Sequence, residues 1–236
     1  MIPSEQLPAE DTPAEGSRLA TVRRFGRVTR LVHWATAATM FCCLGTGAVL
    51  LLPPLAELVG RRQLVESIHL YAGLALPVPM LVAAAAGSYR RDLRSLNRFT
   101  VTDGTWLRAN LRLGTWRRAQ AGAETGAASR IGKFNAGQKL YAAFIAGAIL
   151  VMLGTGTLMR WGAGLPGGLP LAWRTGATFV HDLLTYGLAF GVAGHLWMAA
   201  RDPVARVGII TGTVPAWWAT REHPAWKASP RPPDRR

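Results

Sequence analysis

Four long apolar runs constrain what this chain can fold into more than any other feature. They cover residues 31–52, 64–88, 140–159 and 176–200. A run of about 18 or more apolar residues is long enough to cross the hydrocarbon core of a bilayer as a helix. Because a backbone surrounded by lipid must satisfy its own hydrogen bonds, such runs form helices rather than open strands. The sequence therefore predicts an all-α integral membrane protein whose core is a four-helix transmembrane bundle.

The distribution of basic residues predicts the topology. The chain has a formal net charge of +14, which in a soluble domain would suggest nucleic acid binding. Most of the Lys and Arg residues lie before the first run, between the second and third, and after the fourth, whereas the other two loops hold only Arg61, Arg62, Arg160 and Arg174. Since Lys and Arg accumulate on the cytoplasmic side of membrane spans, both termini and residues 89–137 are predicted to be cytoplasmic. We expect a multi-pass protein of the cell (plasma) membrane, in contact with lipid and not with nucleic acid.

This topology divides the chain into three parts. A cytoplasmic N-terminal tail (1–30) precedes the four-span domain (31–200), and a cytoplasmic C-terminal tail (201–236) follows it. No cleavable signal peptide is visible, because residues 1–30 are polar and rich in Pro and Glu. The basic cytoplasmic loop 89–137 is interpreted either as one or two amphipathic helices on the membrane face or as a solvated loop.

Four of the five histidines lie inside the apolar runs or at their edges. A buried imidazole is costly in lipid and usually has a function. With the predicted topology, His69 and His181 lie near the outer ends of their runs, whereas His33 and His195 lie near the cytoplasmic ends. The four residues therefore form two pairs at two depths, and each pair combines histidines from different helices.

The spacing of the histidines in the fourth run suggests a cofactor. His181 and His195 are fourteen residues apart, which is close to four helical turns, so both project from one face about 21 Å apart along the axis. Haem iron takes two axial imidazoles where the task is electron transfer, and helical bundles hold such cofactors between facing helices. The pattern predicts two haem b groups, held by the pairs His69/His181 and His33/His195. The alternative is a haem-free membrane anchor or transporter component, in which the histidines relay protons or pack.

The remaining residues of interest receive structural interpretations. Cys42 and Cys43 are adjacent in a predicted helix and do not face each other, so they are expected to pack and not to form a disulfide. His223 lies beside Pro224 outside the runs and is interpreted as a surface residue. The Pro- and charge-rich ends, residues 1–20 and 220–236, are expected to be mobile unless a partner orders them.

Three features resemble a known family. They are the segment Arg-Val-Thr-Arg-Leu-Val-His-Trp at residues 27–34, the segment Gly-Lys-Phe-Asn-Ala-Gly-Gln-Lys at residues 132–139, and the spacing from His181 to His195. Together they resemble the cytochrome b (gamma) subunit of respiratory formate dehydrogenase, a prokaryotic dihaem cytochrome b family, over residues 22–205. The ends of the chain and its long Arg-rich loop depart from the family pattern.

The resemblance implies a function and partners. His69 and His181 would hold the outer haem, and His33 and His195 the inner one. Electrons would arrive from an iron–sulfur subunit at the outer haem and leave to menaquinone near the inner haem. A molybdopterin or tungstopterin subunit would carry out the catalysis. This chain has no pterin motif and no cysteine cluster for iron–sulfur binding, so it is not expected to oxidise formate alone. A hydrogenase or another molybdopterin oxidoreductase is the alternative complex, since its cytochrome b subunit would need the same four histidines.

Polar residues before the third run are candidates for the quinone site. Asn135 and Gln138 lie on the predicted cytoplasmic side, and their amides could hydrogen-bond a quinone carbonyl. The competing interpretation is helix capping, since Asn before a helix is a common N-cap. Basic side chains at the same level could pair with haem propionates or could only reflect topology. These are Arg27, Arg30, Lys133 and Arg201.

Overall fold

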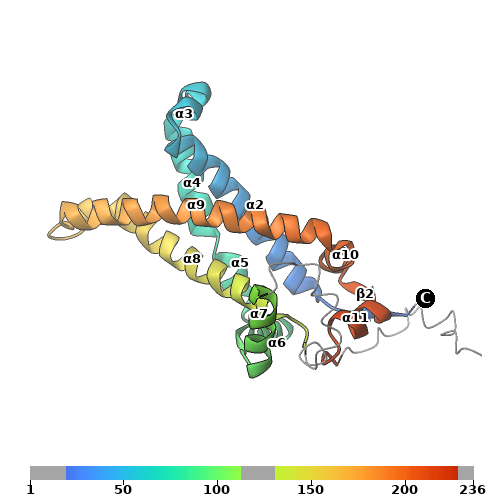
Figure 1. Cartoon of the computed structure of the whole chain (residues 1–236). Helices are drawn as coiled ribbons and strands as arrows, with labels where there is room; N and C mark the ends of the chain where they lie inside the picture. Colours follow the sequence, from blue (N-terminus) through green and yellow to red (C-terminus); the bar gives the residue numbers. More distant parts are fainter. Residues whose placement is uncertain (1–19, 113–130, 228–236) are drawn as a thin grey trace, which may run out of the picture.

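The computed structural model describes residues 20–112 and 131–227, and this part of the chain is almost entirely helical (Figure 1). The helices are α2 (Arg27–Leu51), α3 (Pro53–Val59), α4 (Arg62–Ala75), α5 (Val78–Ala83), α6 (Gly87–Asn97), α7 (Val101–Arg112), α8 (Ala136–Trp161), the short 3-10 helix η3 (Gly162–Gly164), α9 (Leu171–Arg201), α10 (Pro203–Thr211) and α11 (Ala216–Glu222). Two short strands, β1 (Thr21–Arg23) and β2 (Thr213–Pro215), pair antiparallel.

Four helical segments are long and apolar enough to cross a membrane. They are Arg27–Leu51, Arg62–Ala83, Ala136–Gly164 and Leu171–Arg201. Each begins before the corresponding apolar run, because the helical backbone includes polar residues that flank the run. The prediction of a mostly helical chain with four candidate spans is confirmed, whereas the β1–β2 pair was not predicted.

The spans form two helical hairpins that cross. α2 packs along α4, and α8 packs along α9. The hairpins meet where α2 contacts α9 and α4 contacts α8, and their closed ends, at α3 and at η3, point in different directions (Figure 1). One apolar core joins them at the crossing. Its buried members are Met40, Leu76, Ala148, Ile149 and Leu188.

The two hairpins differ in the continuity of their second helix. α4 ends at Ala75, and α5 begins at Val78 after Pro77. A proline inside a helix removes a backbone donor and clashes with the preceding turn, so the helix breaks there. α9 has no proline between Leu171 and Arg201 and runs as one continuous helix. It can therefore carry side chains on one face along its whole length.

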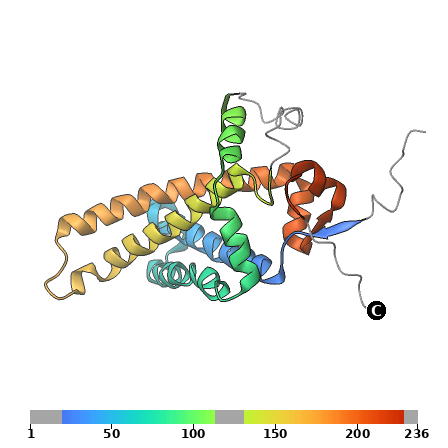
Figure 2. The ribbon, with the colours of Figure 1, turned by 90° about the horizontal axis from the view of Figure 1, so that it is seen from below.

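Two further helices lie at the end of the hairpins that is nearer the chain termini. α6 contacts both α2 and α8, and α7 contacts α8 (Figure 2). Residues 89–97 and 101–112 of the loop 89–137 lie in these two helices, so this part of the loop is helical. Residues 113–130 of this loop lie outside the described residues.

The segments that flank the spans fold together. Val22 of β1 pairs with Val214 of β2, and Val214 packs with Trp218 and Ala219 of α11. His223 follows α11 and is only 4% exposed, so its interpretation as a surface residue is wrong. The expectation of a mobile C-terminal end is also wrong for residues 220–227, because β2 and α11 anchor them to β1. Residues 1–19 and 228–236 lie outside the described residues.

Candidate functional site

The crossing hairpins bring the four span histidines together as two pairs. His69 of α4 faces His181 of α9, with ring centroids 6.1 Å apart and ring planes inclined by 65°. His33 of α2 faces His195 of α9, with centroids 6.2 Å apart and planes inclined by 58°. Each pair therefore joins one hairpin to the other, and α9 contributes one member to each.

The spacing within each pair matches two imidazoles that share a metal ion. With a metal–nitrogen bond of about 2 Å and a ring centre about 1 Å behind the nitrogen, imidazoles on opposite sides of one ion have centroids about 6 Å apart. Among residues 20–112 and 131–227, no group of three or more His, Cys, Asp and Glu side chains could hold a metal ion. Two protein donors at a site suit haem iron, because the macrocycle fills the other four positions. The donor set thus fits haem.

The surroundings of the rings leave them accessible. His33, His69 and His181 are only half-buried, and His195 is exposed. A protein core normally encloses its histidines and satisfies their polar atoms. In both pairs part of each ring surface remains exposed, so a flat macrocycle could contact it.

Threonine hydroxyls hold the rings of the His69–His181 pair. Thr46 Oγ1 lies 2.9 Å from His69 Nδ1 and donates its hydrogen to the carbonyl of Cys42 at 2.7 Å. Thr155 Oγ1 lies 2.9 Å from His181 Nδ1 and donates to the carbonyl of Val151 at 2.8 Å. Each hydroxyl hydrogen is directed to a carbonyl, and the backbone carbonyls of Cys43 and Met152 also bond to the rings of His69 and His181. A carbonyl can only accept, so Nδ1 carries the ring hydrogen, which the hydroxyl oxygen and the carbonyl share. The lone pair of each imidazole is then on Nε2, the nitrogen available to a metal.

Glycines give these two rings their space. A Cβ at Gly47 would lie 3.3 Å from His69 Cε1, and one at Gly156 would lie 3.4 Å from His181 Cε1. Any larger residue would push the ring away from the neighbouring helix. Each glycine directly follows the threonine that anchors the same ring.

Aromatic contacts surround the His33–His195 pair instead. The Tyr141 ring stacks on His195 with centroids 4.9 Å apart and planes inclined by 4°. The Trp34 ring meets His33 edge-on at 5.2 Å. Within the described residues, neither histidine of this pair makes a hydrogen bond through its ring. The orientation of these rings therefore depends on packing.

Asn135 and Gln138 form a reciprocal capping box at the start of α8. Asn135 Oδ1 accepts from the Gln138 backbone N–H at 2.9 Å, and Gln138 Oε1 accepts from the Asn135 backbone N–H at 3.1 Å. The capping interpretation is therefore confirmed. It uses only the two side-chain oxygens, so both amide NH2 groups remain as donors. One turn further along α8 lies Tyr141, which contacts His195.

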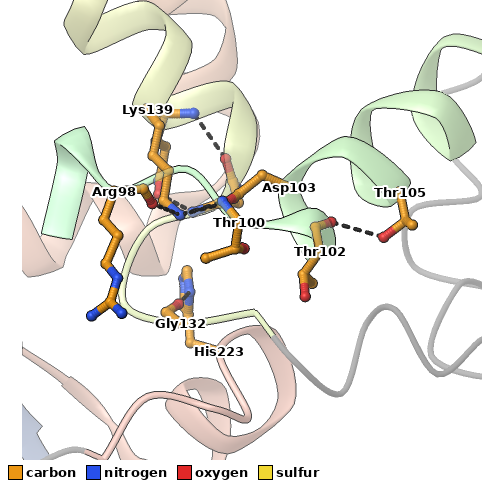
Figure 3. A network of polar contacts seen from close by, with 10 residues as sticks. Arg98, Thr100, Thr102, Asp103, Thr105, Gly132, Lys139 and His223 are labelled. Carbon is orange, nitrogen blue, oxygen red and sulfur yellow. Dashed lines mark hydrogen bonds and ion pairs between the residues drawn. The ribbon is translucent and has the colours of Figure 1, made fainter.

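A buried ion pair fixes the same end of α8 (Figure 3). Lys139 Nζ donates to both carboxylate oxygens of Asp103 at 2.9 and 2.8 Å and to the carbonyl of Arg98 at 3.0 Å. Burial alone would raise the pKa of Asp103, but hydrogen bonds from Lys139 and Thr100 outweigh it and lower the pKa. The pair lines a cavity of about 250 Å³ that also touches Asn135.

His223 takes part in a second buried polar cluster. Its Nδ1 donates to the carbonyl of Gly132 at 2.7 Å, and its Nε2 accepts from Arg24 Nη2 at 3.1 Å. Burial, helped by the charge of Arg24, lowers the pKa of His223 to about 4, although the Gly132 carbonyl opposes the shift. Arg24 also lies over the Trp218 ring at 4.5 Å. This neutral histidine links the β1 strand to the segment before α8.

Several of the basic residues considered for propionates have protein partners. Lys133 pairs with Asp92, which also accepts from Thr29 at 2.9 Å. Arg30 donates to the carbonyl of Ile210. Arg201 lies over the Trp197 ring at 4.1 Å. Arg30, Lys133 and Arg201 thus each have at least one contact within the protein.

Comparison with known proteins gives the family. The family model of the prokaryotic cytochrome b561 matches residues 24–211. The chain belongs to this family. It is therefore a haem b protein of a family of multi-pass membrane cytochromes, and the resemblance to prokaryotic cytochrome b subunits is confirmed. The cytochrome is also 24% identical over 200 residues to the "Formate dehydrogenase, cytochrome b556 subunit" of Haemophilus influenzae, an alignment that covers 84% of this chain and 78% of the relative.

Sequence reasoning missed the threonine and glycine neighbours of His69 and His181. The signal that would have found them is a repeated tetrapeptide, Leu-Gly-Thr-Gly, which occurs in this cytochrome at residues 44–47 and again at 153–156. Both copies lie in the first helix of a hairpin, opposite the histidine of the second helix.

Proposed function

We propose that the chain is the membrane-anchoring cytochrome b subunit of a respiratory dehydrogenase of the formate dehydrogenase type. It would hold two b haems, one between His69 and His181 and one between His33 and His195. The observation that carries the proposal is the spacing of both imidazole pairs, 6.1 and 6.2 Å between ring centroids. The name of the relative from Haemophilus influenzae supports the choice of dehydrogenase.

The haem irons supply one-electron redox chemistry, and the protein supplies their ligands and positions. α9 carries one ligand of each pair on the same face, about 21 Å apart along its axis. Because α9 is continuous, the two sites keep a fixed separation across the hydrocarbon layer. The chain itself would carry electrons between the two haem sites, and partner subunits would oxidise formate.

The proposed direction of transfer combines the topology that the basic residues predict with an electron donor on the outer side. With both termini in the cytoplasm, the His69–His181 pair lies at the outer level and the His33–His195 pair at the inner level. An iron–sulfur subunit bound outside would deliver electrons to the outer pair, and a molybdopterin or tungstopterin subunit would bind to it. Transfer of electrons inward would contribute to the membrane potential.

A quinone such as menaquinone would accept the electrons near the start of α8. The NH2 groups of Asn135 and Gln138 are left free by the capping box, and a quinone carbonyl oxygen needs such donors. Tyr141 lies between this end of α8 and His195. Capping and quinone binding are therefore compatible roles for the same two side chains.

The decisive experiment is the haem count of the purified membrane protein and of two variants. The wild type should bind two haems per chain, with b-type reduced-minus-oxidised spectra. His69→Ala should lose one haem and His33→Ala the other, with distinct residual spectra. His223→Gln is the matched control, because His223 lies outside the spans and should leave both haems in place. A wild type with no haem, or with one haem per chain, would overturn the two-haem proposal.

Co-purification tests the partner complex. The full chain, tagged at its C terminus and expressed in its native host, should retain an iron–sulfur subunit and a formate-oxidising subunit. Formate should then reduce both haems. Reduction by hydrogen and not by formate would assign the cytochrome to a hydrogenase, and recovery of the chain without soluble partners would contradict the proposed complex.

A further inference from the structure

The two hairpins repeat one structural device. In each, a Leu-Gly-Thr-Gly sequence on the first helix faces a histidine on the second. Thr46 of α2 contacts His69 of α4, and Thr155 of α8 contacts His181 of α9. The two threonines thus occupy equivalent helices, because α2 packs against α4 in one hairpin and α8 packs against α9 in the other.

The two copies agree in detail. Both threonine–imidazole contacts measure 2.9 Å. Both hydroxyls donate to the carbonyl four residues earlier, at 2.7 and 2.8 Å, and lie 3.2 Å from the carbonyl three residues earlier. A Cβ on the following glycine would lie 3.3 or 3.4 Å from Cε1 and 3.8 Å from Nδ1. The agreement between two segments that are more than a hundred residues apart indicates one arrangement used twice.

Threonines elsewhere in the same helices separate this device from ordinary helix geometry. A threonine within a helix often bonds to the carbonyl of the preceding turn. Thr39 of α2 and Thr157 of α8 do so with Ala35 and Leu153, and neither contacts a histidine. The contact to a ring nitrogen is thus an additional feature of Thr46 and Thr155.

We propose that Thr46 and Thr155 are a matched pair of positioning residues for one shared haem. Each holds the Nδ1–H of its histidine, so that both Nε2 lone pairs are presented from opposite hairpins, while Gly47 and Gly156 let the rings approach the helices. This inference rests on the proposed function. It goes beyond that function in assigning part of the orientation and basicity of the His69 and His181 rings to two hydroxyl groups, which act beside the backbone carbonyls of Cys43 and Met152.

The hydrogen bond to Nδ1–H should lower the midpoint potential of the haem held by His69 and His181. A hydrogen-bond acceptor on Nδ1–H increases the basicity of the imidazole and strengthens its bond to the metal. A more basic ligand favours the ferric state. Removal of the hydroxyl should therefore raise the midpoint potential of this haem and weaken its binding. Among the described residues, no hydroxyl group bonds to the ring of His33 or His195, so the haem proposed at this pair should be unaffected.

The test uses Thr46→Val, Thr155→Val and the double variant in the full-length purified cytochrome. Transfer of haem to excess apomyoglobin, a redox titration and the low-spin ferric EPR spectrum follow each haem. The double variant should lose the His69–His181 haem about 10- to 100-fold faster, and its potential should rise. Thr46→Ser and Thr155→Ser should restore wild-type values because serine keeps the hydroxyl. Thr39→Val and Thr157→Val are matched controls and should change nothing.

The outcomes separate this inference from the proposed function. Two haems in the wild type with no change in the double Val variant would overturn the inference and leave the function intact. No haem in the wild type would overturn the function. An equal effect on both haems would show a general loss of folding and would also contradict the inference, since the His33–His195 haem is the internal control.

Discussion

The two histidine pairs of this cytochrome have nearly the same spacing but are held by different means. Hydroxyl groups from both hairpins anchor the His69–His181 pair in the same way on each side. The His33–His195 pair is held by aromatic packing, with Tyr141 on one ring and Trp34 on the other. The buried Lys139–Asp103 ion pair lies at the same end of α8 as Tyr141. The His69–His181 site thus uses the same threonine contact twice, whereas the His33–His195 site depends on aromatic packing.

An alignment of the two hairpins on their repeated tetrapeptides shows that the His33–His195 site has no counterpart in the repeat. When Thr46 is aligned with Thr155, His33 falls opposite Ala142. When His69 is aligned with His181, His195 falls opposite Ala83. The counterpart of α9 is also broken at Pro77, so it could not carry a second ligand on one straight face. The repeat therefore produces one shared site, and the continuous α9 adds the other.

The largest expected effect comes from breaking the buried Lys139–Asp103 ion pair, whose lysine lies two residues before Tyr141 in α8. Asp103→Ala leaves Lys139 buried at 8% exposure without its partner. Loss of one member of a buried pair costs about 3–5 kcal/mol. We expect this loss in the free energy of unfolding in detergent, with release of the His33–His195 haem before the other. Glu66→Ala breaks the exposed Arg62–Glu66 pair and should cost about 0–1 kcal/mol. Equal costs for the two variants would contradict the assignment.

A drop in pH should loosen the terminal end of the molecule and spare the His69–His181 pair. The pKa of His223 is about 4 in the folded chain and 6.5 in the unfolded chain. A histidine with a depressed folded pKa contributes stability above pH 6.5 that is lost as the pH falls towards 4. The contribution is up to about 3 kcal/mol. Charged Arg24, which donates to His223, adds repulsion once the ring is protonated.

Hydrogen exchange provides the measurement for this pH effect. Amides of β1, β2 and α11 should exchange faster at pH 5 than at pH 7 after correction for the intrinsic rate, whereas those around Thr46 and Thr155 should not. His223→Gln should abolish the difference because the side chain no longer titrates. Exchange that is independent of pH in the wild type would mean that burial does not keep this ring neutral.

The sequence was sufficient for the mainly helical class, the four candidate spans and the histidines that lie opposite each other. These depend on run length and helical period, which are local properties. The environment of His223 was missed because its burial depends on a strand pairing between residues near opposite ends of the chain. The anchors Thr46 and Thr155 were missed because a threonine in an apolar helix has no distinctive pattern until it is compared with its repeat. The proline at position 77 is visible in the sequence. That the broken helix carries only one of the paired histidines depends on how the hairpins cross, which the sequence does not show.

Replacement of the stacked tyrosine tests the packing of the second site. Tyr141→Leu removes an aromatic pair worth about 0.5–1.5 kcal/mol, so the His195 ring should gain freedom. We expect a broadened EPR signal and an altered potential for the His33–His195 haem only. Tyr141→Phe keeps the stacked ring and should resemble the wild type. If the EPR signal of the His69–His181 haem changed as much as that of the His33–His195 haem, the packing of one site would depend on the other.

The smallest effect is expected at the glycines, where each tetrapeptide contains its own control. Gly47→Ala and Gly156→Ala would place a methyl group 3.3 or 3.4 Å from a histidine ring, so the ring must shift by a few tenths of an ångström. Gly45→Ala and Gly154→Ala meet no atom within 4 Å. All four changes should favour the helix by up to about 1 kcal/mol, but only the first two should shift the spectrum of the His69–His181 haem. Because the repeat makes the two rings equivalent, Gly47→Ala and Gly156→Ala should shift it in the same direction, and opposite shifts would break the symmetry of this site.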